Sequence, residues 1–146
     1  MDKTDIKILN VISQNSRLSV RDIGQKVGVA AITALKRKKA MEKSGVIKKY
    51  TVQIDHEELG YDLTVMFRLQ FARGKLRDAK KVFAPFSFIS SIYEITGDYD
   101  LVAVGKFKTR KELEKFLQRL DAVEYITRVE STLVIKTLRE DVIEVE

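Results

Sequence analysis

The sequence predicts an α+β protein, with an N-terminal helix-turn-helix domain joined by a strand hinge to a ferredoxin-like βαββαβ domain. Residues 19–47 carry two short helical patterns on either side of Gly28, and the second is rich in Lys and Arg. Residues 63–137 alternate strand and helix patterns in the order β-α-β-β-α-β. The expected divisions are a helix-turn-helix domain at 1–54 with its following strand, a hinge at 55–62 and a ferredoxin-like domain at 63–146.

Two helices are expected before the glycine turn. Asp2 or Thr4 can cap the first, which runs to about residue 15 with its apolar side chains facing inward. Ser19, followed three residues later by Asp22, is a plausible N-cap pair for the second. With the helix after the turn they make three, the minimum that can enclose a small core.

The third helix, expected over residues 31–44, is strongly basic. Gly28 supplies the turn before it, and Gly45 stands where a left-handed C-terminal cap is required. A basic second helix after such a turn fits a DNA-binding helix-turn-helix, although basic helical faces are usually solvated surfaces. Between residues 36 and 49 a single acid, Glu42, stands against seven basic residues: Lys36, Arg37, Lys38, Lys39, Lys43, Lys48 and Lys49.

The net charge of +6 is concentrated in the first part of the chain. Residues 1–60 hold 12 Lys and Arg against 7 Asp and Glu, whereas residues 61–146 hold 15 against 14. A basic module joined to a near-neutral one favours a polyanion partner, here double-stranded DNA. A membrane surface is disfavoured because no strongly amphipathic basic helix with Trp or Phe anchors is present.

The remaining elements follow from hydrophobic periodicity. Residues 46–54 predict a strand that pairs with its copy in another subunit or serves as a wing. Pro85 ends a helix predicted at residues 75–84, and Thr109 with Glu112 forms a capping box for another. We expect both helices on one face of a sheet whose strands are residues 63–71, 88–96, 101–107 and 129–137.

That sheet has more apolar surface than two helices can cover. The strands at residues 101–104 and 133–135 are apolar on both faces, so the open face requires a cover, most economically the same face of a second subunit. Burial of a further few hundred Å2 at about 25 cal/mol per Å2 makes a homodimer the expected unit. The alternative is that the surplus reflects a fully buried central strand alone.

Other classes of function are disfavoured. The chain has no cysteine, which excludes disulfides and thiolate metal sites, and we expect its only histidine, His56, to be an ordinary loop residue. No nucleophile–base pair, phosphate loop or metal cluster indicates an enzyme, so neither a cofactor nor a metal is expected. There is no apolar run of about 18 residues and no signal-peptide layout, so we expect a cytoplasmic protein.

The order of these parts resembles the leucine-responsive regulator family, also called Lrp/AsnC or feast/famine regulators. The resemblance covers nearly the whole chain and implies a nucleoid-associated transcription regulator that senses an amino acid or related small molecule. It also implies dimers that often assemble into tetramers or octamers. The residues that carry it are 5–9, 17–19, Gly28-Val29, Arg37, Glu42, 45–47, Tyr50 and the loop 96–100.

In such a domain the first residues of the recognition helix approach base edges, while flanking basic residues hold phosphates. The groove candidates are Ala31, Ile32, Thr33 and Lys36. Arg37 either contacts DNA or pairs with an acid of the first helix. The phosphate candidates are Lys39, Lys43, Lys48 and Lys49, with Arg21 and Lys26 as weaker ones.

Two positions depart from the family pattern. Family members usually have Ser where this chain has Ala30, so a side-chain cap is missing, at a cost of about 1 kcal/mol. They usually have an apolar residue at the position of Lys38, so either its stem lies along the core or the helix is rotated.

The resemblance places the effector site at the loop Gly97, Asp98, Tyr99 and Asp100, with Thr132, Leu133 and Val134 near the other contact region. Asp98 or Asp100 can accept from an ammonium group, and backbone N–H groups can donate to a carboxylate. The alternative for the loop is a plain β-turn. The alternative for the whole protein is an architectural DNA-binding protein with no effector response.

Overall fold

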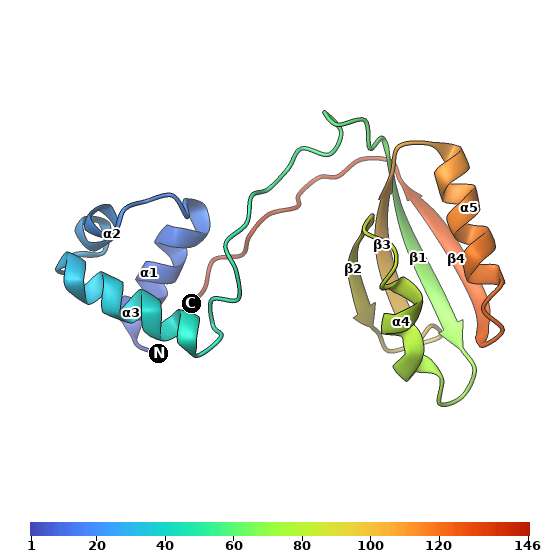
Figure 1. The fold of residues 1–146 in the computed structure, drawn as a ribbon, viewed down its shortest axis with the longest axis horizontal. Helices are drawn as coiled ribbons and strands as arrows, with labels where there is room; N and C mark the ends of the chain where they lie inside the picture. The colour runs from blue at the N-terminus through green and yellow to red at the C-terminus, as the bar shows by residue number, and fades with distance from the viewer. The chain divides into compact units, whose positions relative to one another are not determined.

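The structure, a computed structural model, describes residues 1–146 and divides them into two compact units. Residues 1–53 and 139–146 form the first unit and residues 54–138 the second (Figure 1). No helix is both long enough and apolar enough to span a bilayer.

Residues 139–146, which were expected in the second domain, group with the first unit in the structure. The sheet ends at Val134, so the tail beyond it has no strand neighbour, and its backbone is bonded by the first unit instead. The Asn10 side chain donates to the Val145 carbonyl and accepts from the Val145 N–H, both at 2.9 Å. Gln53 also donates to the Glu140 carbonyl.

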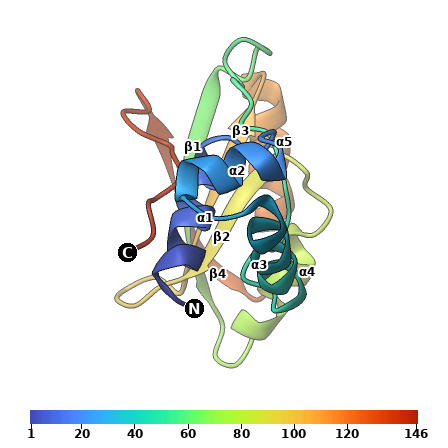
Figure 2. The same cartoon turned by 90° about the vertical axis from the view of Figure 1, so that its left-hand side faces the viewer.

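Three helices make the first unit: α1 (Lys3–Gln14), α2 (Val20–Val27) and α3 (Ala31–Lys43). Both predicted caps are present, since Asp2 and Ser19 each form a reciprocal capping box at the start of α1 and α2. Gly28 has a φ of 81°, a left-handed conformation that lets α3 leave in a new direction, as Figure 2 shows. The helices enclose a core of Ile8, Ile12, Ile23, Ala34 and Met41.

The predicted strand at residues 46–54 does not form in the single chain. These residues join no β-ladder, and Gln53 reaches the backbone of the C-terminal tail only through its side chain. The alternation that favoured a strand leaves Tyr50, Val52 and Ile54 exposed, with Val52 at 74%.

The second unit has the expected ferredoxin-like arrangement of four antiparallel strands in the order β2-β3-β1-β4. The strands are β1 (Leu63–Phe71), β2 (Ile89–Glu94), β3 (Leu101–Phe107) and β4 (Ile126–Val134). Both helices, α4 (Ala79–Phe83) and α5 (Arg110–Asp121), pack on one face, as predicted. There Phe83, Phe116 and Leu120 join Val65, Phe67, Leu69 and Phe107 in the core.

Several boundaries in the second unit differ from prediction. The helix expected at residues 75–84 is a 3₁₀ turn, η1 (Leu76–Asp78), followed by the short α4, because the first turn closes with Asp78 N–H on the Lys75 carbonyl. The last strand begins at Ile126 rather than at residue 129, because a tight turn after α5 returns the chain to the sheet at once. It ends at Val134, opposite Thr64, because β1 begins at Leu63.

Candidate nucleic-acid interface and effector loop

The solvent-facing side of α3 carries a continuous stripe of predicted DNA contacts. Ile32 is 59% exposed, and Lys36, Lys39 and Lys43 are exposed at helical spacings of four, three and four. Ala31 and Thr33 flank Ile32 and are partly exposed. One face of the helix therefore offers an apolar group and three ammonium groups in a row.

Arg37 lies outside that stripe and forms ion pairs with two acids at the start of the chain, one of the two alternatives predicted for it. Its Nη1 donates to Asp2 Oδ2 at 2.6 Å and to Asp5 Oδ1 at 2.9 Å. These bonds raise the pKa of Arg37 and lower the pKa of Asp2. The pKa of Asp5 is lowered first by the Asp2 N–H and then by Arg37. Of the two alternatives for Arg37, the structure selects the one that fastens α3 to the start of α1.

The two departures from the family pattern have distinct outcomes. Ala30 occupies the N-cap of α3 and supplies no side-chain hydrogen bond, as predicted. The Lys38 side chain is only 22% exposed, and its Nζ lies 4.8 Å from the centroid of the Tyr50 ring and 4.0 Å from Glu42. Lys38 thus packs its stem and places its charge beside an aromatic ring and a carboxylate.

Tyr50 completes this small cluster at the end of α3. Its hydroxyl donates to Glu42 Oε1 at 2.7 Å, and burial together with the Glu42 carboxylate raises the pKa of Tyr50 to about 12. The flanking Lys48 and Lys49 remain exposed, as do Arg21 and Lys26 on α2. All the predicted phosphate contacts are therefore accessible.

The loop between β2 and β3 is tied to the end of β1. Asp100 Oδ2 accepts from the Phe71 N–H at 2.7 Å, and the Asp100 N–H donates to the Leu69 carbonyl at 2.9 Å. Gln70 donates to the Asp98 carbonyl. Gly97 has a φ of 108°, which favours glycine. One oxygen of Asp100 is thus already used by the protein, while the side chain of Asp98 is exposed.

Tyr99 is the centre of a charged cluster that the sequence did not predict. Its hydroxyl donates to Glu130, which also pairs with Arg68 and lies 3.8 Å from Arg128. The two guanidinium groups each lie 5.0 Å from the centroid of the Tyr99 ring. The hydrogen bond to Glu130 raises the pKa of Tyr99 and lowers the pKa of Glu130. Only strand register brings these residues together, since Arg68 lies opposite Glu130.

The loop lies nearer to Thr132 than to Val134 within one chain. Val134 is opposite Thr64, far along β1 from Gln70, which contacts the loop. Thr132 is two residues along β4 from Glu130, the acceptor of the Tyr99 hydroxyl, a separation of roughly 7 Å at about 3.3 Å per residue. Thr132 is therefore next to the Tyr99 cluster in the same subunit, whereas Val134 is further away.

Comparison with known proteins identifies both units. A family described as winged helix-turn-helix DNA-binding matches residues 1–48, and one described as the Lrp/AsnC ligand binding domain matches residues 64–143, more than half of the chain. The chain belongs to the Lrp/AsnC family. The Lrp/AsnC resemblance predicted from the sequence is thereby confirmed.

Individual relatives agree with this family assignment. An HTH-type transcriptional regulator of Pyrococcus furiosus is 31% identical, with 97% of this chain and 95% of that protein covered. The regulator FL11 of Pyrococcus horikoshii is 31% identical over 96% of this chain and 93% of its own.

Solved structures share the fold. A transcriptional regulator of Neisseria meningitidis, solved as a complex with L-Met, has a TM-score of 0.90 at 24% identity and covers 97% of this chain and 94% of its own. AsnC of E. coli has a TM-score of 0.85 at 19% identity, over 99% and 98%. This Lrp/AsnC protein is a transcription regulator with a DNA-binding and a ligand-binding domain, and not an enzyme.

Proposed function

We propose that this Lrp/AsnC regulator binds specific DNA sequences through α3, forms homodimers that assemble further, and responds to an amino acid or a similar small molecule. The observation that carries the proposal is that the two sides of α3 have different contacts. Arg37 forms ion pairs with Asp2 and Asp5 at the start of α1. On the solvent-facing side lie Ile32, Lys36, Lys39 and Lys43. As a regulator of chromosomal genes it acts in the cytoplasm, on the nucleoid.

Base recognition is assigned to the start of α3. Ile32 and Thr33 can contact thymine methyl groups, and Lys36 can donate to guanine acceptors in the major groove. Lys39, Lys43, Lys48 and Lys49 hold phosphates, with Arg21 on the preceding helix. Arg37 contributes by holding α3 in place, so its role in DNA binding is indirect.

Dimerisation is assigned to the sheet face that α4 and α5 leave uncovered. Met66 lies opposite Val104 in β3 and Thr132 in β4, and Val102 and Tyr93 pair beside them. Met66 is 40% exposed and Tyr93 57%, which is an unfavourable arrangement for a monomer. A second copy of the same face would bury this apolar surface by two-fold symmetry.

Effector binding is assigned to the Gly97–Asp100 loop. Asp98 is the candidate acceptor for the effector's ammonium group, because Asp100 already accepts from the Phe71 N–H. Loop N–H groups and the nearby Arg128 can donate to a carboxylate. Thr132, two residues along β4 from the Glu130 that binds Tyr99, can join the site from the same subunit, and Leu133 and Val134 follow it. The L-Met complex of the Neisseria relative is consistent with an amino-acid effector.

Fluorescence anisotropy tests the whole proposal. The protein is titrated into a duplex from upstream of its own gene and into a scrambled duplex, with and without a mixture of the 20 amino acids. We expect preference for the native duplex and a shift of that affinity by the mixture, which Asp98→Asn abolishes without changing ligand-free binding. Preference without a shift would refute the effector assignment alone. Equal binding to both duplexes would favour an architectural protein.

A further inference from the structure

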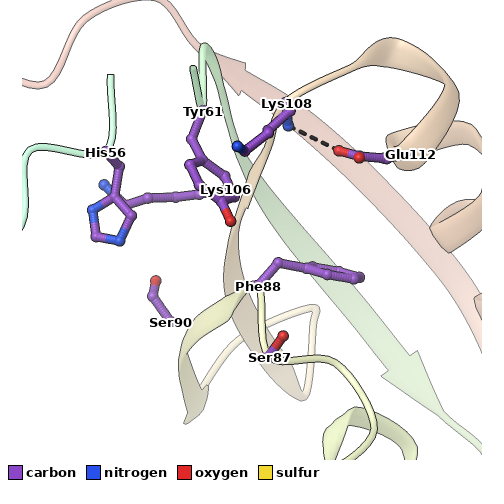
Figure 3. Close-up of a pocket in the computed structure, with 8 residues that line it drawn as sticks. All are labelled: His56, Tyr61, Ser87, Phe88, Ser90, Lys106, Lys108 and Glu112. Atoms are coloured by element: carbon purple, nitrogen blue, oxygen red, sulfur yellow. Dashed lines mark hydrogen bonds between the residues drawn. The ribbon is translucent and has the colours of Figure 1, made fainter. Parts of the chain in front are cut away.

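A cavity of about 370 Å3 lies within the second unit, at the end of the sheet far from the Gly97–Asp100 loop. The loop adjoins the start of β3 at Leu101, whereas the cavity adjoins its far end, at Lys106 and Lys108. Its volume is in the range of small-molecule sites. The lining residues are His56, Tyr61, Ser87, Phe88, Ser90, Lys106, Lys108 and Glu112 (Figure 3).

The lining is rich in groups that donate hydrogen bonds and carry positive charge. Lys106 and Lys108 come from alternate positions at the end of β3, and His56, the only histidine of the chain, faces them from the segment before β1. The Nζ of Lys108 lies 4.9 Å from the centroid of the Tyr61 ring. The hydroxyl groups of Tyr61 and Ser87 add further donors, whereas the Ser90 hydroxyl already donates to the Val104 carbonyl at 3.2 Å.

The single carboxylate in the lining is engaged in a structural role. Glu112 Oε2 accepts from the Lys108 N–H at 2.9 Å and from the Thr109 N–H at 3.3 Å, completing the capping box of α5. Its charge is therefore directed at the start of the helix and its backbone donors. A cation in the cavity would meet two lysines and one occupied carboxylate, so the lining selects an anion.

The wall that carries His56 is a folded turn. Asp55 Oδ1 accepts from the N–H groups of Glu57 and Glu58 at 3.1 and 3.2 Å, and the Tyr61 N–H donates to the His56 carbonyl at 2.9 Å. The His56 and Tyr61 rings meet edge to face with centroids 5.8 Å apart. These contacts hold both rings at the rim of the cavity, so the donors are positioned before a ligand arrives.

We propose that this cavity is a second small-molecule site, which binds a metabolite through an oxyanion, either a phosphate or a carboxylate. Lys106, Lys108 and His56 hold the oxyanion by charge-assisted hydrogen bonds. Tyr61 and the edge of Phe88 contact the rest of the molecule. The site is independent of the effector loop, from which β3 separates it, and it turns the expected ordinary loop residue His56 into a ligand contact.

The lone histidine makes the test direct. The full chain, prepared without a histidine tag, shows the imidazole proton signals of one residue in its 1H NMR spectrum. Sodium phosphate and sodium succinate are titrated separately at constant pH and ionic strength, with chloride as the balancing anion. We expect a saturable shift of the His56 signals with at least one of the two probes. A phosphate preference identifies a phosphorylated ligand, and a succinate preference identifies a carboxylate.

Matched variants separate the cavity from general charge effects. Lys108→Gln should weaken binding at least tenfold, whereas Lys111→Gln, which removes the same charge from the exposed first turn of α5, should leave it unchanged. Unaltered thermal unfolding of both variants shows that the fold is intact. A shift that rises linearly without saturation, or one that both variants reduce equally, would overturn the proposal.

Discussion

Arg37 and Asp2 join the recognition helix to the first turn of the chain, with Nη1 donating to Oδ2 at 2.6 Å. The same Asp2 accepts from the N–H groups of Thr4 and Asp5 and so caps α1. One carboxylate therefore starts α1 and orients α3. The position of the DNA-contacting stripe depends on this cluster as well as on the apolar core.

The contribution of this cluster should depend on pH. The pKa values of Asp2 and Asp5 are lowered in the folded state from the ordinary value of 3.8. Folding therefore favours the ionised carboxylates, and their stabilisation is complete well above pH 3.8 and lost as the pH falls through the lowered values. In thermal unfolding, Arg37→Gln should be less stable than the wild type at neutral pH, and the two should converge in acid. Lys39→Gln, on the exposed stripe, should show no such pH-dependent difference.

A serine at position 30 should stabilise the first unit. Ala30 is the N-cap of α3 and leaves the N–H groups of the first turn without a side-chain acceptor. Ala30→Ser supplies one, and we expect a gain of about 1 kcal/mol in the free energy of unfolding, measured by urea denaturation. Ala40→Ser places the same hydroxyl at an exposed position inside the helix and should give no gain.

Gly24 should not tolerate a side chain. A Cβ at this buried helical position would lie 2.7 Å from the Val29 carbonyl oxygen and 3.2 Å from the Ala31 nitrogen, both in the backbone of the turn before α3. We expect Gly24→Ala to destabilise the first unit by about 1–3 kcal/mol, despite the better helix propensity of alanine. Gln25→Ala, at the exposed neighbouring position, should be nearly neutral. A stable Gly24→Ala protein would show that α2 and α3 lie further apart.

Mutations should distinguish the residues that contact bases from those that contact phosphates. Lys36→Ala should reduce the preference for the native duplex over the scrambled one, because Lys36 is assigned to base edges. Lys48→Ala should lower the affinity for both duplexes by the same factor, because Lys48 is assigned to phosphate contacts. If a dimer neutralises about 8 phosphates, log Kd against log salt should have a slope near 7, and Lys48→Ala should lower it. An unaltered preference in Lys36→Ala would remove that residue from the groove.

A charge on the open sheet face should disrupt the dimer. Val104 lies opposite Met66 and Ser91 on this face, so Val104→Lys would place an ammonium group from each subunit in the apolar two-fold interface. We expect sedimentation equilibrium to show a dimer or larger assembly for the wild type and a monomer for the variant. Gln118→Lys adds the same charge to the exposed side of α5 and should leave the assembly unchanged.

The elements that the sequence predicted well are those whose signals are local. The capping boxes at Ser19 and Thr109 each depend on a pair of residues three positions apart in the sequence, and both are present in the structure. The alternation from Leu63 to Phe71 identified the core face of β1 for the same reason. The prediction of a strand at residues 46–54 was not met, because a strand also requires a neighbouring strand to pair with. The sequence of the segment does not indicate which part of the chain would supply that neighbour.

The candidate sites depended more on long-range contacts. Exposure of Ile32 and Lys36 follows from helical spacing, but the partners of Arg37 come from residues 32 and 35 positions away. The cluster of Tyr99 with Glu130 and Arg68 needs the register of two strands. The cavity at His56 needs the end of β3 beside the turn before β1.

The sequence by itself determined the order of helices and strands, the family and the basic character of the first domain, because periodicity, caps and charge are properties of neighbouring residues. Only the tertiary structure showed that Arg37 pairs with Asp2 and Asp5 and that the last residues bond to α1. It also placed Thr132 two residues along β4 from the Glu130 that binds Tyr99 of the predicted effector loop. These outcomes depend on which residues, distant in sequence, come into contact in the fold. The chemistry of a side chain limits its possible partners, but the fold decides which of them lies within bonding distance.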